Sequence, residues 1–158
     1  MPNLVRLVLV GLGVVLLQWL VFNHLTLWGA YADVILLFVA LQAVRYGRVV
    51  GTVAGFSGGL LMDLVTPGVP FGLFMTLKTL LGFVIGVFRS EQGESLRLYP
   101  PQAAAGALAV TLVHNGLMVM ILALNEGTRN LFLITGLWLG SAVYTAAVAF
   151  VDSLFRSR

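Results

Sequence analysis

The stretch GTVAGFSGGLLMD, residues 51–63, decides the fold of this chain. Gly51, Gly55, Gly59 and Asp63 follow one another at four-residue steps, so in a helix they share one face. In lipid no hydrophobic force drives helices together, and stripes of small residues matter because they let two backbones approach closely. The stretch therefore predicts a membrane helix that packs tightly against a neighbour.

The next apolar stretch carries a matching stripe, with Lys78, Gly82 and Gly86 at the same spacing. A short Thr-Pro-Gly-Val-Pro turn joins the two stretches, so they should be antiparallel neighbours. Asp63 lies just before the turn, and Lys78 lies about 10 Å into the next helix, within reach of a direct or water-bridged ion pair. An unpaired charge at the centre of a membrane helix costs about 2.5–3.5 kcal/mol. We expect the pair to lock the hairpin, while a partner or ligand site and an ion relay remain alternatives.

Composition excludes an ordinary soluble domain, because 59% of the 158 residues are hydrophobic and only 9% are charged. No segment between the apolar runs is long enough to fold alone, which predicts a single integral membrane domain over residues 1–158. The absence of cysteine excludes disulfides, a thiol nucleophile and a Cys-based zinc site. The basic residues flank the apolar runs, so they indicate orientation in the bilayer rather than nucleic-acid binding.

The apolar runs predict an all-α, polytopic membrane protein with six transmembrane helices, at residues 4–22, 32–44, 49–65, 71–88, 103–124 and 131–155. A span needs about 20 residues, and the second run is shorter than that. If all six cross and the N- and C-termini are cytoplasmic, the inner side carries Arg6, Arg45, Arg48, Arg89, Arg97, Arg156 and Arg158, and the outer side only Arg129. If the second run does not cross, most of these arginines move outside. Because loops rich in arginine and lysine stay in the cytoplasm, six crossings are expected.

Three further polar residues are candidates for a role. His114 and Asn115 lie midway along the fifth helix, where they either hydrogen-bond across helices or line a cavity. Asp33 opens the second helix, where a carboxylate suits the helix N-terminus, with partner contact as the alternative. His24 lies in an outer loop, so the two histidines predict no metal site. No catalytic constellation or phosphate-binding glycine loop is present, which predicts a protein that is not an enzyme and needs no cofactor.

The stretch from Gly51 to Asp63, followed by Pro-Phe-Gly-Leu at residues 70–73, resembles the rod shape-determining protein MreD family. The length, the six runs and the basic ends extend the resemblance over the whole chain. The resemblance implies a non-catalytic component of the bacterial inner (plasma) membrane that supports cell elongation, rod shape and peptidoglycan synthesis. Its partners would be MreC and, through it, RodA, a class B penicillin-binding protein and MreB, with membrane lipid around it.

The MreD family is also similar in fold to the substrate-binding subunits of energy-coupling-factor (ECF) vitamin transporters, which are the alternative. Such a subunit needs a pocket with convergent polar groups, and Asp63, Lys78, His114 and Asn115 could line one. It usually also has an alanine-rich stripe in its first helix, whereas residues 4–22 contain no alanine. This difference favours the cell-shape family, in which the charged and glycine positions are structural or partner-binding.

Overall fold

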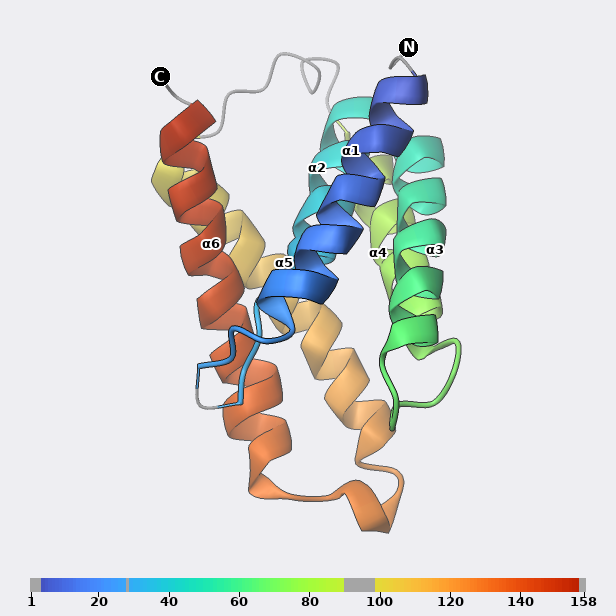
Figure 1. Ribbon diagram of the computed structural model, residues 1–158, viewed down its shortest axis with the longest axis vertical. Coiled ribbons are helices and arrows are strands. Elements are labelled where there is room, and N and C mark those ends of the chain that lie inside the picture. Colours follow the sequence, from blue (N-terminus) through green and yellow to red (C-terminus); the bar gives the residue numbers. More distant parts are fainter. Residues whose placement is uncertain (1–3, 28, 90–98, 157–158) are drawn as a thin grey trace. The chain divides into compact units, whose positions relative to one another are not determined.

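The computed structural model describes residues 4–27, 29–89 and 99–156, and the regular structure within them is helical, apart from an isolated bridge between Leu27 and Ala30. The helices are α1 (Leu4–Leu17), the π-helical η1 (Gln18–Phe22), α2 (Val34–Tyr46), α3 (Arg48–Val65), α4 (Leu73–Val87), α5 (Pro100–Leu122), the short 3-10 helix η3 (Glu126–Thr128), the π-helical η4 (Leu133–Gly140) and α6 (Ser141–Arg156) (Figure 1). They begin and end within a few residues of the ranges expected from the apolar runs. Arg97 and Arg158, which entered the charge count, lie outside the described residues.

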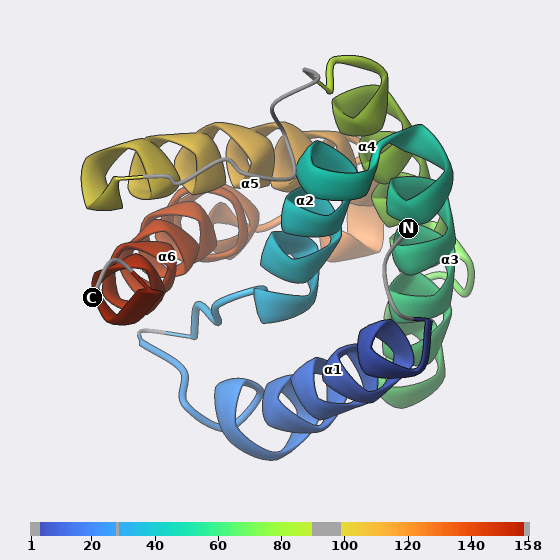
Figure 2. The ribbon, with the colours of Figure 1, turned by 90° about the horizontal axis from the view of Figure 1, so that it is seen from above.

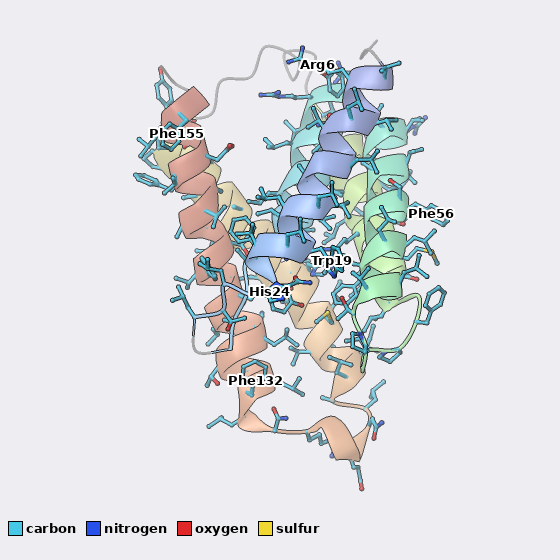
Figure 3. The ribbon with its side chains drawn as sticks, viewed as in Figure 1. Arg6, Trp19, His24, Phe56, Phe132 and Phe155 are labelled. Atoms are coloured by element: carbon cyan, nitrogen blue, oxygen red, sulfur yellow. The ribbon has the colours of Figure 1, made fainter. Side chains whose placement is uncertain are left out.

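Among the described residues, four helical segments are long and apolar enough to cross a membrane: Val5–Phe22, Arg48–Val65, Pro100–Leu122 and Leu133–Phe155. The apolar helices Val34–Tyr46 and Leu73–Val87 are shorter, at 13 and 15 residues. Large apolar side chains such as Phe56 and Phe155 point away from their helices and are exposed (Figure 3). An all-helical, polytopic membrane protein is therefore shown, while only four of the six expected crossings meet the length of a span.

The chain forms two compact units. Unit 1 comprises Met1–Val21 and Ile35–Leu96, and unit 2 comprises Phe22–Val34 and Arg97–Arg158. In unit 1, α3 has α4 on one side and contacts α1 as well (Figure 2). In unit 2, α5 packs along η4 and α6.

A single glycine makes the turn between α2 and α3. Gly47 is the one residue between the two helices, and its φ of +86° lies in the left-handed region that glycine adopts without strain. A Cβ atom at this position would also lie 3.2 Å from the Arg89 side chain. The tight turn reverses the direction of the chain between α2 and α3, and it lies beside the end of α4.

Candidate functional site

The two glycine stripes face each other across α3 and α4. A Cβ atom added at Gly55 would collide with the carbonyl group of Lys78, and one added at Gly51 or Gly82 would collide with the backbone of the other. Gly59 meets the backbone at the start of α4, and Gly86 meets the backbone at the start of α3. Because backbone atoms cannot rotate out of the way, these positions have no room for a side chain. The stripes are thus occupied by the α3–α4 contact within unit 1.

Asp63 closes the same hairpin by capping α4. Its Oδ1 accepts a hydrogen bond from the Phe74 N–H at 3.1 Å, and its Oδ2 accepts one from the Met75 N–H at 2.9 Å. Gly72 precedes α4 and has no side chain to satisfy these N–H groups, so the carboxylate from α3 does so instead. The expected ion pair between Asp63 and Lys78 is therefore wrong. Among the described residues, Asp63 makes these two hydrogen bonds and no ion pair with Lys78.

The Lys78 side chain is buried rather than exposed on the surface of the protein. Its Nζ lies 5.7 Å from the centroid of the Phe74 ring, within the range of a cation–π interaction. The Lys78 backbone carbonyl forms the surface against which Gly55 packs. Asp63 thus joins α3 to α4 through its carboxylate, and Lys78 contributes its backbone to the same hairpin.

In unit 2 the segment that precedes α2 is tied to α6. The Asp33 N–H donates to Thr145 Oγ1 at 3.0 Å, and Ser141 Oγ donates to the Tyr31 carbonyl at 2.7 Å. Burial raises the pKa of the Tyr31 hydroxyl above its ordinary value, and the negative charge of Asp33 adds to the rise, so the phenol stays neutral. Asp33 is itself buried, directly before the first residue of α2.

A chain of hydrogen bonds orients two buried polar side chains on α5. Asn115 Nδ2 donates to the Leu137 carbonyl at 2.9 Å, and Asn115 Oδ1 lies 2.8 Å from His114 Nδ1. Since the amide nitrogen is the donor to Leu137, the amide oxygen must accept, so Nδ1 of His114 carries the proton.

A second hydrogen bond between α5 and η4 has its donor on η4 and its acceptor on α5. Trp138 Nε1 donates to the Leu112 carbonyl at 3.0 Å, while Asn115 donates to Leu137, so each element gives one side chain to the backbone of the other. Gly116 permits the approach, since a Cβ atom there would lie 3.3 Å from Trp138 Nε1. η4 is π-helical, a form that recurs at functional sites.

We call Thr111, His114 and Asn115 the α5 polar face, because residues three and four apart share one side of a helix. All three are buried. The sequence pattern predicted candidate roles for His114 and Asn115, but none for Thr111 or for Ser141 and Thr145 on α6. The same spacing, applied to every hydroxyl in the apolar runs, would have found them.

A protein-family model described as "ECF-type riboflavin transporter, S component" matches residues 4–151. No curated protein and no solved structure matches the chain. The expected MreD membership is therefore wrong, and with it the role in cell elongation and the partners MreC, RodA, penicillin-binding protein and MreB.

The structure explains why the motif misled. The glycines of residues 51–63 allow close helix packing, and Asp63 caps the next helix. Any tight membrane hairpin can use small residues and a cap in this way, so the motif does not identify one family. The lack of alanine in residues 4–22, which favoured the cell-shape family, did not exclude the transporter family. The chain belongs to the family of ECF-type riboflavin transporter S components, and it is a multi-pass protein of the inner membrane.

Proposed function

We propose that this protein is the substrate-binding subunit of an ECF importer and that it captures riboflavin or a closely related vitamin in the membrane. The observation that carries the proposal is the family match over residues 4–151. Such a subunit binds its substrate without transforming it, so it is not an enzyme. Its partner would be an energising module made of ATPase and T components. Since the match runs through both compact units, residues 1–158 would act as one integral membrane domain.

We also propose that all six helices cross the bilayer and that both termini are cytoplasmic. In unit 1, the start of α1 with Arg6, the α2–α3 turn with Arg45 and Arg48, and Arg89 after α4 lie at one end (Figures 1 and 3). In unit 2, the connection between α5 and η4, which contains Arg129, lies at the end opposite to the last residues of α6 (Figure 1). This distribution supports the proposal because basic residues accumulate on the cytoplasmic side.

The α5 polar face is the best candidate for contact with the vitamin. Ligand sites are mostly apolar and use a few polar groups in fixed positions to orient the ligand. His114 and Asn115 meet this description, because their hydrogen bonds to each other and to Leu137 set which atoms donate and accept. Asp63 is a weaker candidate, since both of its oxygens are engaged by the start of α4.

Titration of riboflavin into the purified protein in detergent tests the proposal. Riboflavin fluoresces, and stacking or burial in a protein changes its emission, so binding can be followed directly. We expect saturable binding at one site, with no binding of thiamine or biotin as controls. The absence of saturable riboflavin binding would contradict the proposed substrate. Co-purification with a T component and ATPases from native membranes tests the proposed partners separately.

A further inference from the structure

Several hydroxyl groups on the helices bond to a backbone carbonyl of the preceding helical turn. Four side chains donate to the carbonyl four residues earlier: Thr52 to Arg48 at 2.7 Å, Ser57 to Val53 at 2.9 Å, Thr79 to Met75 at 2.6 Å and Thr135 to Leu131 at 3.1 Å. This is a common local arrangement for serine and threonine within a helix, and it satisfies each of these four hydroxyl groups.

Thr111 does not follow this pattern. Its side chain is fully buried in α5, yet Oγ1 has no hydrogen-bond partner within residues 4–27, 29–89 and 99–156. Two other side-chain oxygens share this property, those of Gln42 and Thr66, but both residues are partly exposed. A buried hydroxyl without a partner costs free energy, and native proteins almost always supply one. The Thr111 hydroxyl is therefore a buried donor that the described residues leave without an acceptor, and a bound ligand or an ordered water could supply one.

Thr111 lies beside two other buried polar side chains. It lies one helical turn before His114 and Asn115, so its hydroxyl belongs to the face whose other polar atoms are already oriented. We propose that the Thr111 hydroxyl donates a hydrogen bond to a ring carbonyl of the bound ligand and that it determines ligand specificity. The inference rests on the proposed function and extends it to one atom. A ligand without an acceptor at this place would leave the hydroxyl buried and unsatisfied, and would bind more weakly.

Two substitutions separate the hydroxyl from the shape of the side chain. Thr111→Val keeps the shape and removes the hydroxyl, whereas Thr111→Ser keeps the hydroxyl. We expect Thr111→Val to raise the Kd for riboflavin by about tenfold, the size of one buried hydrogen bond, and Thr111→Ser to change it by less than about threefold. Thr135→Val is the matched control, because its hydroxyl bonds to Leu131 and its side chain is exposed, so its Kd should equal that of the wild type.

The ligand-free proteins supply a second readout. Thr111→Val removes an unsatisfied buried group, so without riboflavin it should unfold at or above the wild-type temperature, and its weaker binding would not reflect misfolding. If Thr111→Val does not fold, Thr111→Ala replaces it under the same criteria.

The outcomes distinguish this inference from the proposed function. Wild-type binding with an unchanged Kd for Thr111→Val would overturn the inference and leave the proposed function standing. Equal weakening by Thr111→Val and Thr111→Ser would also overturn it, since the hydroxyl would not be the cause. A wild-type protein that does not bind riboflavin would refute the proposed function itself.

Discussion

Replacing Gly55 by alanine tests the α3–α4 contact directly. In Gly55→Ala the new Cβ atom would collide with the Lys78 carbonyl and would lie 2.9 Å from the Cα atom of Thr79. Both neighbours belong to the backbone of α4, so the two helices would have to move apart. Gly106 in α5 offers a matched control, because no heavy atom lies within 4 Å of a Cβ atom added there.

The two substitutions make the same chemical change in different surroundings. Each gains about 0.5–1 kcal/mol from the higher helix propensity of alanine. At Gly106 nothing offsets this gain, so the free energy of unfolding should rise by about that amount. At Gly55, overpacking against rigid backbone costs about 1–3 kcal/mol, at the upper end of this range because no side chain can rotate away. We therefore expect Gly55→Ala to lower the free energy of unfolding by about 1–2 kcal/mol, a difference of about 2–3 kcal/mol from Gly106→Ala.

Unfolding in mixed micelles with increasing sodium dodecyl sulfate measures both free energies. Cross-linking of cysteine pairs introduced on α3 and α4 reports their separation, and the chain has no native cysteine to interfere. Cross-linking should become slower in Gly55→Ala and stay unchanged in Gly106→Ala. A Gly55→Ala variant that is as stable as Gly106→Ala and cross-links at the wild-type rate would show that α4 leaves room for a side chain at Gly55.

Two further substitutions test single hydrogen-bonding groups. Asp63→Ala should lower the free energy of unfolding by about 1–2 kcal/mol, as expected for a lost helix cap, and should speed amide hydrogen exchange at Phe74 and Met75; unchanged exchange at both amides would argue against capping. Asn115→Leu leaves the buried Leu137 carbonyl without its donor and should cost about 1–3 kcal/mol, measured by the same unfolding assay, and weaken riboflavin binding as well. An Asn115→Leu variant with the wild-type free energy of unfolding and the wild-type affinity for riboflavin would show that the Asn115 side chain contributes to neither.

The sequence was sufficient to predict where the helices lie and that the two glycine-bearing helices form a hairpin. Apolar length and four-residue spacing are local properties, so residues 51–63 predict both a membrane helix and the face on which it packs. The same local patterns could not identify the family. Glycine stripes and a helix-capping carboxylate are required by the geometry of a tight hairpin, whatever the function of the protein. The sequence identified His114 and Asn115 as polar groups in an apolar run, but it could not identify the Leu137 carbonyl as the acceptor for Asn115.

Only the tertiary structure decided which partner each polar group takes. The number of residues between them placed Asp63 within reach of Lys78. The turn, however, ends at Gly72 with φ +92°, and the carboxylate instead accepts hydrogen bonds from N–H groups at the start of α4. Asn115 and Leu137 are 22 residues apart and meet because α5 packs along η4. A hydrogen bond depends on the distance and direction between two atoms, and these are set by how the helices pack rather than by the order of residues along the chain.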